Sequence, residues 1–348
     1  MEMTLSKQHQ QLGAQFVERD GFTLPQTYGN LHDEYDAMYF GAGLIDLAHF
    51  GAVRVQGPDR VNWLHKLVTA NVQAAPERGR VHGLLLNAKG HVVADFDLLR
   101  LPDSFLLYTS VRAKSKLVAQ LRRAIFREKV TLEDDVDLAV LSLQGAQAEE
   151  VLTRTLGTDA APPVNGFSTT KFFDSELLIV SNPRVQMGGL DLLVERRHLE
   201  ILWEMLVAKD AKPIGLGALN AARIEAGIAW FGDDFDETML APEARLDEFV
   251  AENKGCYTGQ EVIARIKNRG HVNRWLTQFR VEGSVVPERG DLIFADGKEA
   301  GWITSAAWSF EDDAPCALGY LRREAVEACA AVQIAHGVAR LNAAVKQG

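Results

Sequence analysis

The stretch Lys254-Gly255-Cys256-Tyr257-Thr258-Gly259-Gln260-Glu261 brings a thiol, an ammonium, a carboxylate, an amide and two glycines together within eight residues. A thiolate close to a lysine and ahead of a helix is stabilised by the ammonium and by the helix dipole, so Cys256 is a candidate catalytic residue. Gly255 and Gly259 would let the backbone approach a ligand closely. The alternative is that Cys256 is a small buried residue in a tight turn. The charged and amide neighbours favour the first interpretation.

The formal charge changes sign around this stretch. Between positions 233 and 252, eight acidic residues accompany a single basic one, Arg245. Between positions 254 and 274, five basic residues accompany a single acidic one, Glu261. The basic run from Arg265 to Arg274 could bind phosphates, RNA or a polyglutamate tail, and a solvated charged helix and turn is the alternative.

Four short apolar segments follow the basic run, at 278–281, 292–295, 302–305 and 317–320. Their spacing of roughly ten residues is typical of a small β-barrel or sandwich. We therefore expect a C-terminal β-barrel domain over 271–348. The remainder, 1–270, is expected to form a larger α+β core of two intertwined subdomains.

Strands and helices alternate upstream of the stretch. Asn87-Ala88-Lys89-Gly90 lies between two apolar runs and predicts a hairpin, because Gly90 can adopt a positive φ. Apolar residues recur at a period near 3.6 over 117–125, which predicts a helix. An Ala-rich helix is expected over 215–227, and residues 1–40 look partly helical. Strands that alternate with helices, some of them antiparallel, predict an α+β fold.

Composition narrows the class of protein. The 348 residues carry a formal charge of −10, with 47% hydrophobic and 24% charged residues, which is ordinary for a globular protein of two or three domains. The N-terminus has no signal or transit peptide pattern, and no segment approaches the roughly 18 apolar residues of a membrane span. We therefore expect a soluble, cytoplasmic protein. The acidic balance argues against a general nucleic-acid binder.

Cysteines and histidines show no metal-binding pattern. Cys256, Cys316 and Cys329 are widely spaced and form no Cys-x-x-Cys pair, which argues against a disulfide framework and against a four-cysteine site. The nine histidines have no spacing typical of ligands. No bound metal is expected.

Three carboxylates could take part in chemistry. Alternation along a strand places Asp95 and Asp97 on one face, where they could act as a base or hold a cationic amine; a solvated strand face is the alternative. Glu225 lies in the Ala-rich helix, and a buried carboxylate needs hydrogen-bond donors. A ligand with adjacent N–H groups, such as a pterin, would supply them, and so would a salt bridge to Arg223 or another arginine.

The stretch at 254–261 closely resembles the Lys-Gly-Cys-x-x-Gly-Gln-Glu signature of the YgfZ family. These are folate-binding proteins related to the T-protein, or aminomethyltransferase, of the glycine cleavage system. Val55-Gln56-Gly57-Pro58-Asp59 resembles the opening unit of the T-protein. Arg223-Ile224-Glu225-Ala226-Gly227 resembles its central folate-site helix, and 290–305 resembles its C-terminal barrel, so the resemblance spans nearly the whole chain.

The resemblance implies a three-domain, T-protein-like α+β fold around a central channel that binds tetrahydrofolate, with a small C-terminal β-barrel. It also implies an accessory role in the assembly or repair of iron–sulfur clusters, with an indirect effect on tRNA-modifying iron–sulfur enzymes. The implied partners are folate and iron–sulfur proteins or their assembly machinery, without membrane or direct nucleic-acid binding. The alternative is a tetrahydrofolate-dependent aminomethyltransferase, an enzyme that transfers a one-carbon unit.

Site residues carry over from the resemblance by position. Glu225 matches the glutamate that holds the pterin ring, Asp95 matches the second of two adjacent aspartates, the one tied to methylene transfer, and Phe50 matches an aromatic residue next to the folate. Two positions depart from the T-protein pattern: the first aspartate is Ala94, and the pterin-contacting asparagine is Thr109. These departures argue against glycine-cleavage activity and leave a folate site. The implied signature site consists of Lys254, Gly255, Cys256, Tyr257, Gly259, Gln260 and Glu261.

Overall fold

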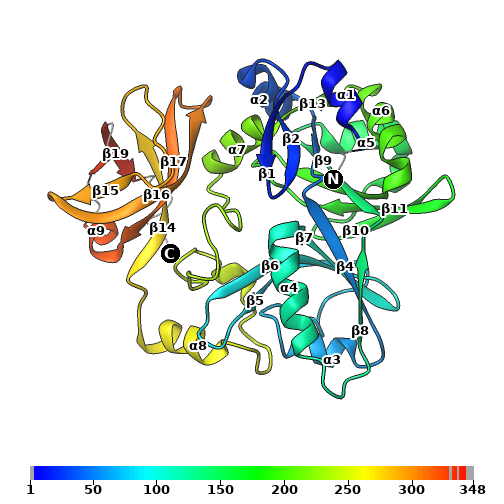
Figure 1. Ribbon diagram of the computed structural model, residues 1–348, viewed down its shortest axis with the longest axis horizontal. Coiled ribbons are helices and arrows are strands. Elements are labelled where there is room, and N and C mark those ends of the chain that lie inside the picture. Colours follow the sequence, from blue (N-terminus) through cyan, green and yellow to red (C-terminus); the bar gives the residue numbers. More distant parts are fainter. Residues whose placement is uncertain (1–3, 329–330, 335–336, 342–348) are drawn as a thin grey trace.

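The computed structural model describes residues 4–328, 331–334 and 337–341. Three sheet-based bodies surround a middle region (Figure 1). In that view a closed barrel forms the body on the left, and two sheets form the bodies at the lower and upper right. The segment between α7 (Leu216–Glu225) and α8 (Gln260–Arg269), yellow-green in Figure 1, runs through the middle region.

The five-stranded sheet is antiparallel throughout and has the strand order β5-β6-β7-β4-β8. The predicted hairpin at 87–90 is confirmed: it joins β5 to β6, and Gly90 has a φ of +79°. Apolar side chains of α3 and α4 pack against the sheet to form its core. The strands are β4 (Phe50–Gln56), β5 (Arg80–Leu86), β6 (Val92–Arg100), β7 (Ser104–Ser110) and β8 (Thr131–Asp135).

The six-stranded sheet has the order β10-β11-β12-β9-β3-β13, in which only the β3–β13 pair is parallel. Its strand β3 precedes the five-stranded sheet in the chain, and its other strands follow that sheet. The five-stranded sheet is therefore inserted between strands of the six-stranded one. The strands are β3 (Gly43–Asp46), β9 (Leu138–Gln144), β10 (Phe167–Phe172), β11 (Ser175–Ser181), β12 (Gly189–Glu195) and β13 (Lys212–Pro213).

The predicted C-terminal barrel is confirmed. Its strand order is β14-β17-β16-β15-β18-β19, and β14 closes the ring by pairing with both β17 and β19. The first barrel strand begins at Arg274, so the proposed boundary between 270 and 271 falls in the link after α8. The strands are β14 (Arg274–Val281), β15 (Leu292–Ala295), β16 (Lys298–Ser309), β17 (Ala314–Arg322), β18 (Val332–Ile334) and β19 (Gly337–Leu341).

The N-terminal segment, expected to be partly helical, also contains a hairpin that the sequence analysis missed. Strands β1 (Gln15–Arg19) and β2 (Phe22–Thr27) pair around Asp20 and Gly21, which both have positive φ. An Asp-Gly pair between two strands is a hairpin signal. The remaining helices are α1 (Ser6–Gln11), α2 (Leu31–Phe40), α3 (Arg60–His65), α4 (Val111–Arg123), α5 (Ala148–Leu156), α6 (Leu199–Val207) and α9 (Arg323–Glu327), and α7 lies within the predicted 215–227.

The two sheets share one apolar core, to which α7 also contributes. Leu47, Tyr108 and Leu219 belong to that core and also line the cavity described below. Helix α7 reaches the barrel through Ile224, which packs in a separate cluster with barrel residues such as Leu318. Helix α7 therefore connects all three bodies, and the α+β prediction is confirmed.

Candidate functional site

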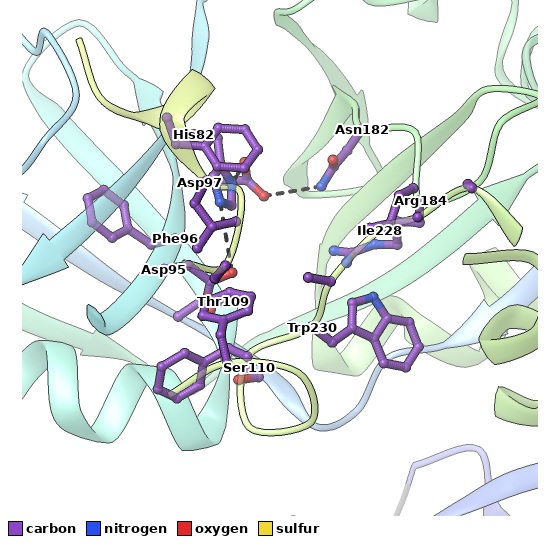
Figure 2. Close-up of a pocket in the computed structure, with 18 of the residues that line it drawn as sticks. His82, Asp95, Phe96, Asp97, Thr109, Ser110, Asn182, Arg184, Ile228 and Trp230 are labelled. Carbon is purple, nitrogen blue, oxygen red and sulfur yellow. Dashed lines mark hydrogen bonds and ion pairs between the residues drawn. The ribbon is translucent and has the colours of Figure 1, made fainter. Parts of the chain in front are cut away.

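A cavity of about 690 Å³ lies where the three bodies meet. This volume is within the roughly 300–1,000 Å³ of small-molecule sites. Strands β4 to β7 form one wall, the segments after β11 and α7 form the opposite wall, and β14 of the barrel contributes a third. Figure 2 shows the first two walls facing each other, with His82, Asp95 and Thr109 on one side and Arg184 and Trp230 on the other.

Asp95 and Asp97 both line the cavity from β6, as alternation along the strand predicted. They do not form a solvated strand face, because Asp97 is buried and the Asp95 side chain is only 20% exposed. His82 of β5 lies between the two carboxylates. Its Nδ1 is 3.0 Å from Asp97 Oδ1 and its Nε2 is 3.8 Å from Asp95 Oδ2.

The two carboxylates have opposite environments. Asp97 accepts hydrogen bonds from Arg80 Nε at 2.9 Å and Asn182 Nδ2 at 3.2 Å. Burial alone would raise its pKa, but Arg80 and His82 hold the pKa of Asp97 well below its usual range. Burial raises the pKa of Asp95, and His82 opposes this only in part. Two carboxyl groups whose pKa values are moved apart are suited to different roles: Asp97 is a permanent anion, and Asp95 is the candidate proton acceptor.

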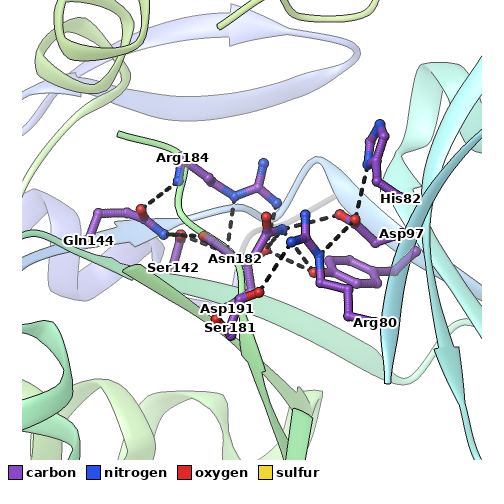
Figure 3. A network of polar contacts seen from close by, with 10 residues as sticks. Arg80, His82, Asp97, Ser142, Gln144, Ser181, Asn182, Arg184 and Asp191 are labelled. Carbon is purple, nitrogen blue, oxygen red and sulfur yellow. Dashed lines mark hydrogen bonds and ion pairs between the residues drawn. The ribbon is translucent and has the colours of Figure 1, made fainter. Parts of the chain in front are cut away.

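A buried polar network fixes the opposite wall (Figure 3). At its centre is Asp191 of β12, which is fully buried. Arg184 donates to both of its carboxylate oxygens, at 3.0 and 2.7 Å, and Asn182 connects it to Asp97 across the two sheets. Breaking such a buried ion pair costs about 3–5 kcal/mol, so the network holds the two walls in register. The other donors to Asp191 are Ser142, Tyr108 and Asn182.

Four residues of the wall carry a buried side-chain atom that has no hydrogen-bond partner in the described part of the chain. They are Asp95 (Oδ1), His49 (Nδ1), Arg19 (Nε) and Arg245 (Nε). Burial lowers the pKa of His49 well below its usual range, so its imidazole is neutral. Buried polar atoms without partners are rare in native proteins, and a ligand or ordered water is a common explanation. The cavity can therefore accommodate a ligand that carries both donors and acceptors.

Phe50 and Thr109, both inferred from the resemblance, also line the cavity. They lie side by side on β4 and β7, where Phe50 pairs with Ser110 and the next residue pairs with Thr109. The guanidinium of Arg184 lies over the Phe50 ring, 4.5 Å from its centroid. The structure therefore brings Phe50, Thr109 and Asp95 together in one wall.

Glu225 is not among the described residues that line the cavity, although the two residues after it are. It is the last residue of α7 and is half-buried. Its carboxylate lies close enough to Tyr35 of α2 to raise the pKa of that phenol together with burial, and it accepts a 3.5 Å hydrogen bond from the Glu311 N–H. The salt bridge considered as the alternative is also not among the described contacts, because Arg223 pairs with Asp234. The pterin contact of Glu225 remains a prediction.

The cysteine segment, residues 254–261, is likewise not part of the described cavity wall. The Lys254 ammonium donates to three backbone oxygens, one on the last residue of α3 and two just beyond it, so the lysine ties the segment to the end of that helix. Burial lowers the pKa of Lys254 to about 8. The expectation that this ammonium stabilises a Cys256 thiolate is not supported by these contacts. The acceptors are His65 O at 2.7 Å, Val68 O at 2.5 Å and Ala70 O at 2.8 Å.

Gly259 serves close packing within the protein. Its φ is +84°, and a Cβ there would lie 2.7 Å from the carbonyl oxygen of Asn87. Gly90 of the same hairpin packs against Val262 of α8, and Tyr257 is buried in the adjoining core. The segment thus docks on the β5–β6 turn, and the close approach allowed by Gly259 is to that turn.

Cys256 itself is exposed, as is Gly255. It lies three residues before Gly259, the N-cap of α8, whereas the helix dipole acts mainly within the first turn. Gln260 and Glu261 begin the helix, half-buried and exposed respectively. Of the other cysteines, Cys316 is buried, and Cys329 lies outside the described residues.

Several wall residues were missed by sequence reasoning. Asn182 and Arg184 directly follow a buried strand, where polar residues often have functional roles, and this signal was available. Arg245 stood out as the single basic residue of an acidic run. His82 could not be found in this way, because its relation to the carboxylates depends on the register that pairs it with Asp97.

Two further observations concern the described residues as a whole. None of their helices is long and apolar enough to cross a membrane. No cluster of three or more His, Cys, Asp or Glu side chains among them is arranged to hold a metal ion.

The fold and the site together define an α+β protein with a C-terminal barrel and a polar cavity where its three bodies meet. A model of the GCVT N-terminal domain matches residues 5–254, and a model of the glycine cleavage T-protein C-terminal barrel domain matches residues 274–347. The chain therefore belongs to the family of glycine cleavage T-protein relatives that these domains define. Tetrahydrofolate, the cofactor implied by the resemblance, is the cofactor of this family.

Individual relatives agree with this placement. The chain is 29% identical to an aminomethyltransferase of Rubrobacter xylanophilus over 308 residues, which cover 88% of this chain and 82% of that protein. It is 27% identical to an aminomethyltransferase of Thermotoga neapolitana, with coverage of 88% and 85%. The structure of aminomethyltransferase T from Bartonella henselae superposes with a TM-score of 0.89 at 22% identity, over 97% of this chain and 95% of that one, which shows a shared fold. These matches support the T-protein relationship and do not single out the YgfZ branch.

Proposed function

We propose that the cavity binds tetrahydrofolate and that the protein is a tetrahydrofolate-dependent aminomethyltransferase. The observation that carries the proposal is the unpartnered Oδ1 of Asp95, held in a cavity of ligand size on a wall shared with Phe50 and Thr109. Relatives that cover most of this chain are named aminomethyltransferase, which favours this function over an accessory role.

The wall residues fit such a ligand. A reduced pterin carries N–H groups that suit the acceptors of the first wall. The neutral imidazole of His49 can donate or accept a hydrogen bond. When bound, tetrahydrofolate supplies a nitrogen that accepts a one-carbon unit.

The chain's own part in the reaction is positioning and proton transfer. Asp95 Oδ1 can accept a hydrogen bond from an amine in the cavity and take its proton, because no described donor occupies it. Asp97 stays ionised beside Arg80 and holds the Nδ1 side of the His82 ring. His82 is thereby oriented with its Nε2 toward Asp95. An amine held by Asp95 in a fixed position next to the folate nitrogen reacts faster, because less entropy is lost in reaching the transition state.

Formation of 5,10-methylene-tetrahydrofolate from an aminomethylated carrier protein tests the proposal. The wild-type protein is expected to form this product, and Asp95→Asn is expected to form little of it while still binding tetrahydrofolate, because the amide keeps an oxygen that can accept a hydrogen bond and loses the charge needed to take a proton. Binding is measured by titration calorimetry. Binding of tetrahydrofolate without any product would contradict the transferase function.

The same calorimetry tests the role that the resemblance gives to Glu225. Because its carboxylate lies near α2, Glu225→Ala is expected to change tetrahydrofolate affinity by no more than about 3-fold, which is under 1 kcal/mol. Loss of binding in this variant would restore Glu225 to the pterin site.

A second candidate function is the accessory role in iron–sulfur cluster assembly or repair, with effects on tRNA-modifying enzymes. The exposure of Cys256 on a segment anchored away from the cavity favours it, because a partner can reach the thiol. Ala94, at the position of the first T-protein aspartate, is consistent with it. A strain that lacks the protein is complemented with wild type or Cys256→Ser, and iron–sulfur enzyme activity is measured. Full rescue by Cys256→Ser would remove this candidate.

A further inference from the structure

The arginines that line the cavity are not equivalent. Four of them contribute to its wall, and three are neutralised by carboxylates. A neutralised arginine has less to gain from an anionic ligand than an unneutralised one. The neutralising pairs, with N–O distances between 2.6 and 2.9 Å, are Arg19 with Asp233, Arg80 with Asp97 and Arg184 with Asp191.

Arg245 is the exception. In the described part of the chain it forms no ion pair, and its Nε is buried without a hydrogen-bond partner. Its guanidinium lies over the Trp275 ring, 5.1 Å from the centroid. Burial lowers its pKa, and the charge of Asp247 opposes this without an ion pair. A guanidinium carries donors only, so its unmet requirement is an acceptor, best supplied by an anion.

The backbone holds this side chain in place. Arg245 adopts a φ of +58°, which is uncommon for a residue with a side chain. Its neighbours Ala244 and Leu246 are buried, and Leu246 N–H donates to Ala241 O at 3.0 Å across the turn. The turn is therefore anchored on both sides of Arg245, and the guanidinium is presented at a fixed place next to the barrel strand that carries Trp275.

Two residues of the cavity wall have complementary deficits in hydrogen bonding. Asp95 lacks a donor on one carboxylate oxygen, and Arg245 lacks an acceptor. The neutral pterin of tetrahydrofolate offers donors, and its glutamate tail offers carboxylates. A single elongated ligand that is uncharged at one end and anionic at the other satisfies both.

We propose that Arg245 binds the tail carboxylate of the folate ligand and determines the preference of the cavity for ligands with an anionic tail. The proposal rests on the proposed function, because it takes tetrahydrofolate as the ligand. It adds a residue that recognises the tail, and it assigns the opposite end of the ligand to the wall that carries Asp95.

Titration calorimetry with two ligands tests the proposal: tetrahydrofolate, and 6-methyltetrahydropterin, which has no tail. Arg245→Gln is expected to weaken tetrahydrofolate binding by about 10- to 100-fold, as for the loss of a charge-assisted hydrogen bond. Its affinity for 6-methyltetrahydropterin is expected to stay within about 2-fold of wild type. Arg245→Lys should recover part of the loss, since it restores the charge without the planar fork.

Arg322→Gln is the matched control, because Arg322 is an exposed arginine outside the described cavity wall. It is expected to change neither affinity. Equal tetrahydrofolate affinity in wild type and Arg245→Gln would overturn the inference, and so would equal losses for both ligands. If wild type binds neither ligand, the proposed function fails first, whereas wild-type binding that is insensitive to Arg245 removes this inference alone.

Discussion

The cavity wall and the cysteine segment at 254–261 contain similar chemical groups and use them in opposite ways. In the cysteine segment, Lys254 is surrounded by three backbone acceptors, and Gly259 packs onto a turn. In the cavity wall, Asp95, His49 and Arg245 have buried atoms without partners among the described residues. The polar groups of the segment therefore find hydrogen-bond partners within the protein, whereas some buried polar groups of the wall are left to be paired by a ligand.

The difference shows why local density of reactive residue types is a poor guide to the reacting site. The segment has many such residues next to one another in sequence, whereas the wall assembles its residues from separate strands and loops. The wall is distinguished by buried polar atoms that lack hydrogen-bond partners, and this feature can be recognised only in the three-dimensional structure. Cys256, exposed and not among the described residues of the wall, is better suited to contact with a partner.

The largest expected effect comes from Asp95→Asn. If Asp95 accepts the proton, aminomethyl transfer should fall by about 10²- to 10⁴-fold, the usual contribution of a general base. Single-turnover measurement with saturating tetrahydrofolate isolates the chemical step. The matched control is Cys256→Ser, which should transfer at the wild-type rate. A larger loss of transfer rate in Cys256→Ser than in Asp95→Asn would place the chemistry in the cysteine segment and not in the cavity wall.

Lys254→Met should mainly affect stability. Three backbone oxygens lose their donor while the apolar part of the side chain is retained, and the free energy of unfolding should fall by about 1–3 kcal/mol. Urea denaturation measures this change. Lys267→Met serves as the control, because its ion pair with Glu252 is exposed and is worth about 0–1 kcal/mol. Equal stabilities of the two variants would show that Lys254 does not anchor the segment.

The pH dependence of transfer should report Asp95. Its carboxyl must be deprotonated to accept a proton, and burial raises its pKa above the usual value of about 3.9. The rate should therefore fall by about tenfold per pH unit below that raised pKa and level off above it. Asp97 remains ionised over the same range because its pKa is lowered. A profile that instead follows the titration of a thiol, and disappears in Cys256→Ser, would assign the chemistry to the cysteine segment.

The sequence predicted the features that depend on local pattern. The 87–90 turn, the same-face placement of Asp95 and Asp97, and the barrel all follow from alternation, turn chemistry and spacing. The resemblance placed Phe50 and Thr109 in what proved to be a cavity wall.

The remaining features depend on contacts between distant segments. The Glu225 carboxylate lies near Tyr35 of α2 and accepts a hydrogen bond from the Glu311 N–H, 86 residues later in the chain. The partners of Lys254 lie more than 180 residues earlier in the chain. Neither contact can be recognised from the neighbouring sequence. The predicted pterin contact of Glu225 and the predicted pairing of Lys254 with a Cys256 thiolate could therefore not be checked from sequence pattern alone.

The smallest expected effect is on the stability of Cys256→Ser. The side chain is exposed, so the free energy of unfolding should change by less than about 0.5 kcal/mol. Thermal denaturation, with the buried Cys316→Ser as the contrasting variant, measures it. A destabilisation of Cys256→Ser as large as that of Cys316→Ser would mean that the segment packs its thiol after all.

The most direct test of the account is the crystal structure of the protein with tetrahydrofolate bound. We expect electron density for the ligand within the cavity, with a pterin N–H within hydrogen-bond distance of Asp95 Oδ1 and a tail carboxylate at Arg245. Density for the ligand beside Cys256, or an empty cavity at saturating tetrahydrofolate, would contradict the assignment of the site.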